Sequence, residues 1–426
     1  MEKHDEKYQT YVEIMKRELI PAMGCTEPIA LAYCAAKARA VLGSIPEKIV
    51  IEASGNIIKN VKSVIVPNTN GRRGIEAAAA IGIIAGHEES GLEVLSQVSE
   101  KQKEEFMEYM QKASFFVKKA ESDLLLDIIV KVYKGDSRAS VRVANTHTNV
   151  VHIEKDGHVI FDQSVGEEIE QDMPDYNMLS VRDLYEFAQK VDLDDVKDIL
   201  ERQISYNTAI SEEGLKGDYG ANIGSVLLET YGDDVRNRAK AKAAAGSDAR
   251  MNGCELPVVI NSGSGNQGMT VSLPVIEYAN EWQCGDDMLY RALIISNLTA
   301  IHQKTGIGRL SAYCGAVSAG AAAGAGIAYL KGGGYEEIAH AIVNALAITS
   351  GIICDGAKAS CAAKIATAVD AGIFGHDMYL KGQQFYRGDG VVSAGVENTI
   401  KNIGRLGRDG MRETDKEILY IMTCVD

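Results

Sequence analysis

Residues 314–330 form a run made mostly of alanine and glycine, CGAVSAGAAAGAGIAYL. These residues are weakly apolar, and the run is shorter than the ~20 residues that a helix needs to cross a bilayer. The pattern is typical of a helix that is buried on all sides, because small side chains let neighbouring helices approach closely. We therefore expect a tightly packed helical core around this run, and no membrane partner.

The chain has 426 residues, more than one hydrophobic core normally serves, so two domains are expected. Helical and strand-like patterns alternate in residues 1–175, which predicts an α+β domain with an antiparallel sheet covered by helices. Residues 176–426 are almost entirely helical in pattern and are interrupted by glycine-rich corners. They are predicted to form an all-helical domain, in which the strand-like residues 256–260 are the main ambiguity.

Helices of the first domain are expected at residues 8–19, 26–42, 74–85 and 101–112. Thr26 is the expected N-cap of the second helix, and Gly43 its stop signal. Strands are expected at 49–52, 57–66, 124–133, 139–143, 149–154 and 158–161. The last two flank Asp156-Gly157, a dipeptide that favours a tight hairpin turn.

The net charge of −15 argues against a nucleic-acid partner, because nothing would offset repulsion from phosphates. The first residues are polar and lack the apolar stretch of a secretory signal, so a cytoplasmic location is expected. In that reducing compartment the eight cysteines are not expected to form structural disulfides. Clustered cysteines there more often bind metal or take part in chemistry.

Three cysteines lie in segments that could bring them together. Asp355-Gly356 indicates a turn, which puts Cys354 in a loop and Cys361 in the first turns of the following helix. Cys314 stands at the start of the Ala/Gly run, and helix N-termini favour thiolates. The alternative is that all three are buried as small hydrophobic residues. Zinc is disfavoured, because no fourth Cys or His falls at zinc-finger spacing nearby.

Four strings resemble the L-cysteine desulfidase group and its relatives in the serine dehydratase alpha-chain superfamily. These strings are GCTEP at 24–28, NSGSGNQG at 261–268, RLSAYCG at 309–315 and CDGAKASC at 354–361. The resemblance implies a helical domain of the serine dehydratase alpha-chain type and a 4Fe–4S cluster with one open iron site. It implies Cys314, Cys354 and Cys361 as the cluster ligands and Cys25 as the catalytic base.

The activity implied by the resemblance is β-elimination from L-cysteine to give pyruvate, ammonia and hydrogen sulfide. L-Serine is the alternative substrate. In the bacterial serine dehydratases the two later cysteines are spaced more widely than Cys354 and Cys361, which favours the desulfidase branch. Cys25 would precede a helix start, which lowers a thiol pKa. A homodimer is the oligomer considered, since such enzymes are commonly symmetric dimers.

Two glycine-rich loops could hold the substrate. Ser262, Ser264 and Asn266 precede a probable helix and offer hydroxyl and backbone N–H groups for an anion. Asn68 and Asn70, before another helix, would form a second cradle, and together the loops would place the site between the domains. Both could instead be ordinary helix starts. The loop at 262–268 lacks the lysine of the P-loop and the spacing of the dinucleotide fingerprint, which disfavours nucleotide binding.

Other residues are weaker candidates. Arg250, in Asp248-Ala-Arg250, could contact a carboxylate. His147 and His152 are expected to be partly exposed sheet residues, although one could reach the site.

Two rival functions remain open from sequence. A pyridoxal-phosphate lyase could run the same reaction, but it needs a Schiff-base lysine and a phosphate cup, and no lysine stands in such a context. A non-catalytic iron–sulfur or amino-acid sensor is the alternative of another class. A sensor has no need of a thiol base, so the role of Cys25 separates the two.

Overall fold

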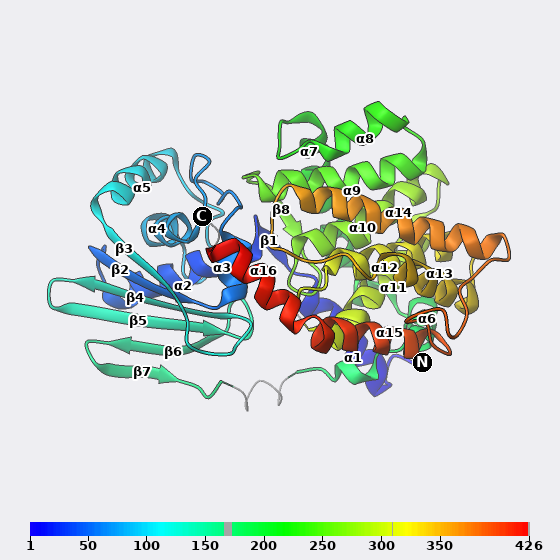
Figure 1. The fold of residues 1–426 in the computed structure, drawn as a ribbon, viewed down its shortest axis with the longest axis horizontal. Helices are drawn as coiled ribbons and strands as arrows, with labels where there is room; N and C mark the ends of the chain where they lie inside the picture. The colour runs from blue at the N-terminus through cyan, green and yellow to red at the C-terminus, as the bar shows by residue number, and fades with distance from the viewer. Residues whose placement is uncertain (166–172, 309, 425–426) are drawn as a thin grey trace.

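The computed structural model describes residues 1–165, 173–308 and 310–424. In Figure 1 the left part of the molecule is a layer of strands with helices over one face, and the right part is a larger body of helices. The N-terminus lies at the helical body, and the last helix runs back toward the sheet (Figure 1). The chain is thus mixed α/β, with its sheet in the N-terminal part and a helical C-terminal part, as the sequence predicts at this level.

The sheet has six strands in the order β3-β2-β4-β5-β6-β7. Their bounds are β2 Lys48–Ala53, β3 Ser114–Lys119, β4 Asp127–Lys134, β5 Ser137–Ala144, β6 Val150–Lys155 and β7 His158–Asp162. The prediction of an antiparallel sheet is wrong at one edge, where β3 pairs parallel to β2. No alternation of apolar and polar residues marks β3, because all but one of its side chains are exposed, as an edge strand allows.

Helices α2 Thr26–Leu42, α4 Ile75–Ala85 and α5 Glu100–Lys112 cover the sheet, as expected. Two local predictions are wrong. The N-cap of α2 is Cys25, so Thr26 is the first helical residue. The strand expected at 57–66 is helix α3 Gly55–Val61 followed by a loop. The apolar residues of α3 lie on the buried side of a short helix. A short apolar run of this kind does not by its pattern distinguish a helix from a strand.

The helical body contains one short strand, β8 Pro257–Val259, which corrects the all-helical prediction and resolves the ambiguity at 256–260. Its helices are α6 Val181–Lys190, α7 Lys197–Lys216, α8 Ile223–Tyr231, α9 Val235–Met251, α10 Gly265–Glu281, α11 Asp286–Ile307, α12 Gly315–Leu330, α13 Tyr335–Thr349, α14 Ser360–Leu380, α15 Val396–Arg405 and α16 Arg412–Cys424.

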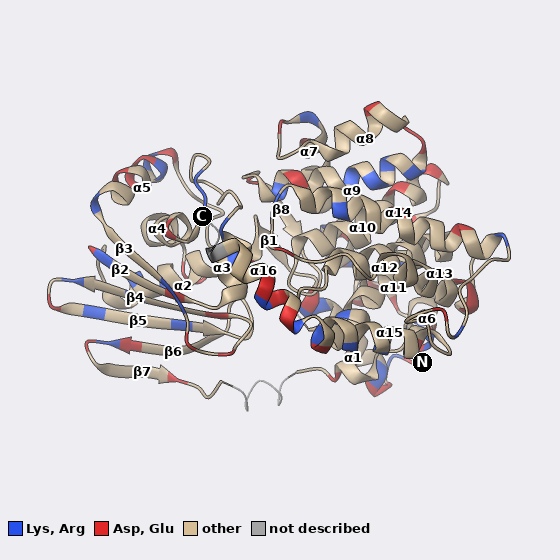
Figure 2. Cartoon of the chain, viewed as in Figure 1, with Lys and Arg blue, Asp and Glu red and all other residues tan. Residues whose placement is uncertain are grey.

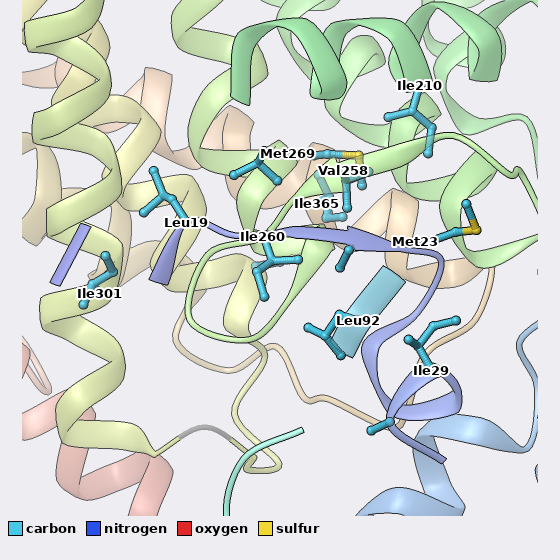
Figure 3. Packing of buried hydrophobic residues seen from close by; sticks show 14 of the residues in the cluster. Leu19, Met23, Ile29, Leu92, Ile210, Val258, Ile260, Met269, Ile301 and Ile365 are labelled. Carbon is cyan, nitrogen blue, oxygen red and sulfur yellow. The ribbon is translucent and has the colours of Figure 1, made fainter. Parts of the chain in front are cut away.

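The two ends of the chain connect the two parts: α1 Glu6–Glu18 lies on the helical body, and α16 runs back toward the sheet. Helix α1 packs on the helical body where the rings of Tyr8 and Tyr11 contact Phe187 edge-on. Strand β1 Pro21–Met23 then pairs antiparallel with β8 before the chain enters α2. Figure 3 shows Met23, the last residue of β1, and Val258 and Ile260 of the helical body, which all belong to one hydrophobic cluster. The predicted boundary at 175 assigns α1 to the first domain, whereas α1 packs on α6 of the helical body.

Helix α12 is the Ala/Gly run, and it lies against α14 with the two backbones in direct contact. A Cβ at Gly320 would lie 2.3 Å from the carbonyl oxygen of Ala368, and one at Gly324 would lie 2.4 Å from that of Gly372. These contacts advance by one turn in the same direction on both helices, so α12 and α14 run parallel. Their N-termini therefore lie side by side.

Figure 2 shows charged residues along α5 and α16, whereas α12 contains none. Within the described residues, no helix combines the length and the apolar character that crossing a bilayer requires.

Gly372→Ala is expected to lower the free energy of unfolding by about 2 kcal/mol, because the new methyl group would collide with backbone that side-chain rotation cannot move. The Cβ would lie 2.1 Å from the carbonyl oxygen of Gly320. Gly334→Ala is the control, since its Cβ meets nothing within 4 Å. Urea unfolding followed by circular dichroism compares them, and equal stability would contradict the backbone contact.

Candidate active site

Cys314 and Cys354 are brought together by a short antiparallel pairing of two loops. The bridge joins Tyr313 to Ile353, with Cys314 N donating to Ile352 O at 3.2 Å and Cys354 N donating to Ala312 O at 2.7 Å. Alternate residues of paired segments point to the same side. Cys314 and Cys354 are therefore diagonal neighbours on one face, a relationship with a typical separation of about 7–8 Å.

Cys361 joins them from the first turn of α14, and Cys314 is the N-cap of α12. The loop before α14 is held by Asp355, whose carboxylate pairs with Lys358 at 2.5 Å and with Lys364. Gly356 lies against α3, and Cys361 Sγ donates to its carbonyl oxygen at 3.3 Å. The predicted positions of Cys354 in a loop and Cys361 in a helix start match this geometry.

The three thiols line one cavity and influence one another electrostatically. Burial first, and then the charges of Cys354 and Cys361, raise the pKa of Cys314 to about 12. Burial and the charge of Cys354 also raise the pKa of Cys361. Neutral thiols are favoured in this environment unless positive charge is supplied among them.

The cavity has a volume of about 110 Å³. Since one water molecule needs roughly 10–15 Å³ by the same measure, this volume suits a small molecule. Four helix N-termini contribute to its wall: α2 through Glu27, α10 through Ser264, α12 through Gly315 and α14 through Cys361. Helix N-termini carry partial positive charge, so the cavity favours negatively charged groups.

Buried basic side chains strengthen this preference. Lys59, Arg250 and Lys304 all line the cavity and are 2%, 3% and 6% exposed. Lys59 Nζ pairs with Asp415 Oδ1 of α16 at 2.5 Å, so the last helix holds this cation in place. Glu27 is the acidic side chain on the wall among the described residues. A chain of net charge −15 thus encloses a mainly cationic cavity.

Arg250 is fixed by contacts from both parts of the chain. Its Nε donates to Asn266 Oδ1 at 3.0 Å, and its Nη1 donates to Gly24 O at 2.9 Å. The oxygen of Asn266 also accepts from Ser247 at 2.8 Å. Asn266 lines the cavity as expected, but its side-chain oxygen is engaged in positioning Arg250. Gly265 allows this packing, because a Cβ there would lie 2.8 Å from Nη1 of Arg250.

Ser262 and Ser264 also line the cavity. Ser264 is the N-cap of α10, and its Oγ accepts from Gln267 N at 3.4 Å. Ser262 has a positive φ of 51° and donates its hydroxyl to Asn261 Oδ1 at 3.0 Å. The loop thus turns sharply and presents the start of α10 to the cavity.

The structure does not bring Asn68 and Asn70 to this cavity, contrary to the expectation of a second cradle. Both have positive φ, 62° and 54°, which asparagine tolerates in tight turns. Asn68 Nδ2 donates to Leu95 O at 2.9 Å, and Asn70 is exposed. Their glycine-rich sequence serves a turn before α4.

Cys25 lies next to the cavity but is not part of its wall. It is fully buried in a small cluster with Val64 and Met251, against which Ala357 and Cys361 pack. Burial raises the pKa of Cys25 to about 11, although Arg250 acts in the opposite direction. The expectation that the helix start lowers this pKa is therefore not met, because desolvation outweighs it.

Some residues on the wall were not among the predicted site residues. His147 follows β5 in a turn, is 7% exposed and reaches the cavity, which a sheet position did not suggest. Lys59, Tyr313 and Gln267 also line it. Gln267 and Tyr313 stand in two of the quoted strings, but a string does not show which of its side chains reach a cavity. Lys59 stands in no such string, and only tertiary packing reveals it. Arg309, which begins one quoted string, lies outside the described residues.

The family model for the serine dehydratase alpha chain matches residues 89–420, and the chain therefore belongs to that family. The match includes all three clustered cysteines and the loop at 262–268, while Cys25 lies before it. Membership suggests a lyase of the serine dehydratase type, in a family generally associated with iron–sulfur clusters.

Whole-length relatives are named UPF0597 proteins. One from Desulfitobacterium hafniense is 60% identical over 422 residues, covering 99% of this chain and 98% of the relative. Another, from Lachnoclostridium phytofermentans, is 54% identical, covering 97% of this chain and 99% of the relative. A third, from Treponema denticola, is 48% identical and covers 98% of each.

Gly356→Ala is expected to detach the cysteine loop from α3. Gly356 has a φ of +90°, and a Cβ there would lie 2.5 Å from the carbonyl oxygen of Lys59. In the metal-free protein, Cys354 and Cys361 should then react several-fold faster with a disulfide reagent, as located by mass spectrometry. Gly351→Ala is the control, because its Cβ meets nothing within 4 Å. Unchanged reaction rates in both variants would show that this contact does not hold the loop.

Proposed function

We propose that this protein is an iron–sulfur-dependent β-elimination lyase that acts on a small β-substituted amino acid, with L-cysteine as the first candidate substrate. The observation that carries the proposal is the meeting of Cys314, Cys354 and Cys361 on the wall of one small, mainly cationic cavity. The reaction converts L-cysteine and water to pyruvate, ammonium and hydrogen sulfide.

The proposed 4Fe–4S cluster would be held by three cysteines that line one cavity wall. Within the described residues, no three His, Cys, Asp or Glu side chains are close enough to share one ion. Diagonal spacing of Cys314 and Cys354 suits a larger inorganic group, and burial among helix N-termini favours its negative charge. When bound through three cysteines, such a cluster would supply a Lewis-acidic iron for the leaving group.

The substrate carboxylate is assigned to Arg250 and the start of α10. Arg250 is held by Asn266 and Gly24, so its guanidinium is already oriented before substrate arrives. The first N–H groups of α10 have no partner within the helix, which makes them donors for an anion. Lys59 and Lys304 add positive charge to the same wall.

Cys25 is proposed to accept the Cα proton, a role that requires its buried thiol to lose its proton and to face the cavity when substrate is bound. Cys361 packs against the small buried cluster that contains Cys25, so Cys25 lies close to the clustered thiols. Removal of the Cα proton and departure of the β-substituent leave an enamine, which tautomerises and is hydrolysed to pyruvate and ammonium. His147, on the cavity wall, is the alternative acceptor.

L-Serine is the second candidate substrate, because the family model that matches the chain is described as the serine dehydratase alpha chain. The two reactions differ only in the leaving group, sulfide or water. Side-by-side assays of both amino acids under anaerobic conditions decide between them.

Anaerobically purified protein is expected to contain iron and acid-labile sulfide, with a broad visible absorbance that fades in air. Cys354→Ser should remove most of the iron, because it leaves only two of the three cysteines. Cys284→Ser is the matched control: Cys284 lies in the turn between α10 and α11 and is half-buried, so iron content should not change. Iron content equal in wild type and Cys354→Ser would remove Cys354 from the ligand set.

Cys25→Ser is expected to retain iron and sulfide while abolishing pyruvate formation from L-cysteine, because a hydroxyl is a much weaker proton acceptor than a thiolate. Pyruvate is measured anaerobically with lactate dehydrogenase, alongside His147→Gln. Retained turnover in Cys25→Ser, with loss in His147→Gln, would transfer the base role to His147. Wild-type protein that holds a cluster but eliminates from neither amino acid would favour the sensor.

A further inference from the structure

We propose that Gln267 recognises the α-ammonium group of the substrate through its side-chain oxygen and thereby selects amino acids over other carboxylic acids. This inference rests on the proposed function for the class of ligand. It concerns a residue to which neither the resemblance nor the family gives a role.

Gln267 lies in the first turn of α10, is 4% exposed and lines the cavity. Its side chain rests on Gly315, the residue that follows Cys314. A Cβ at Gly315 would lie 2.7 Å from Cδ and 2.8 Å from Nε2 of Gln267. The absence of a side chain at Gly315 therefore gives the amide of Gln267 its place beside the clustered cysteines.

The side-chain oxygen of Gln267 is buried and accepts no hydrogen bond from any residue in the described parts of the chain. Buried polar groups are nearly always bonded, because an amide loses its water partners when it is buried. A carbonyl oxygen has only lone pairs to offer, so its missing partner must be a donor. The wall of the cavity thus carries an acceptor prepared for an N–H or O–H of a ligand.

An α-amino acid supplies such a donor next to its carboxylate. The cations Lys59, Arg250 and Lys304 suit the carboxylate and repel the ammonium group. Glu27, the acidic side chain among the described residues of the wall, can attract the ammonium group by its charge. Gln267 offers a neutral acceptor on the same wall. A site that hydrogen-bonds a substrate N–H discriminates strongly against analogues without it.

The test compares L-alanine with propionate as ligands of the anaerobically purified full chain, by isothermal titration calorimetry. These molecules differ only in the ammonium group, and neither has a β leaving group, so no turnover interferes. Wild-type protein should bind L-alanine at least about tenfold more tightly than propionate. Gln267→Met keeps the length of the side chain and removes its polar atoms. It should weaken L-alanine binding by about tenfold or more and change propionate binding by less than about twofold.

Two further variants separate recognition from folding. Gln267→Glu retains an acceptor of the same shape and should keep the preference for L-alanine. Gln303→Met is the matched control: Gln303 is 1% exposed on α11, donates to Thr299 O and Ser318 O, and does not line the cavity. It should leave the ratio of the two affinities unchanged even if stability falls.

Three results would overturn the inference: equal weakening of both ligands in Gln267→Met, unchanged L-alanine affinity in that variant, or no preference for L-alanine in wild type. Failure of the proposed function has a separate readout. Protein that prefers L-alanine through Gln267 yet forms no pyruvate from cysteine or serine would retain the recognition role and lose the lyase.

Discussion

The backbone contact between α12 and α14 is the constraint on which the site depends. Glycines at 320, 324 and 372 let the two helices lie closer than any side chain would permit. Because the helices run parallel, the same contact brings their N-termini together, with Cys314 at one and Cys361 at the other. The pairing of Tyr313 with Ile353 then adds Cys354. Tight packing thus determines which thiols meet.

The charge around the clustered cysteines has the opposite sign to the net charge of the chain. The protein carries a net charge of −15, yet four helix N-termini and three buried basic side chains surround the cavity. Burial raises the pKa of Cys314 to about 12 and also raises the pKa of Cys361, which favours their neutral forms. A cationic wall is an environment in which an anionic substrate and the negatively charged cluster of the proposal could both be held.

The site also depends on contacts between distant parts of the chain. Arg250 of the helical body is fixed by Gly24, which directly precedes Cys25, and Lys59 of α3 is held by Asp415 of the last helix. Strand β1 pairs with β8 just before the loop at 262–268. These connections mean that substitutions near either terminus can change the cavity, even though most of its wall belongs to the helical body.

The sequence by itself determined most helices and strands, the buried character of the Ala/Gly run, and the loop and helix-start positions of the three cysteines, because periodicity and turn residues act locally. It did not determine the parallel edge strand β3, helix α3 or the irrelevance of Asn68 and Asn70 to the cavity. It also did not reveal that Asn266 positions Arg250, that Gln267 reaches the cavity, or which of His147 and His152 does so. These features were decided by tertiary structure, because burial, unpaired amides and contacts between remote segments arise only when helices pack, and spacing along a chain carries no record of them.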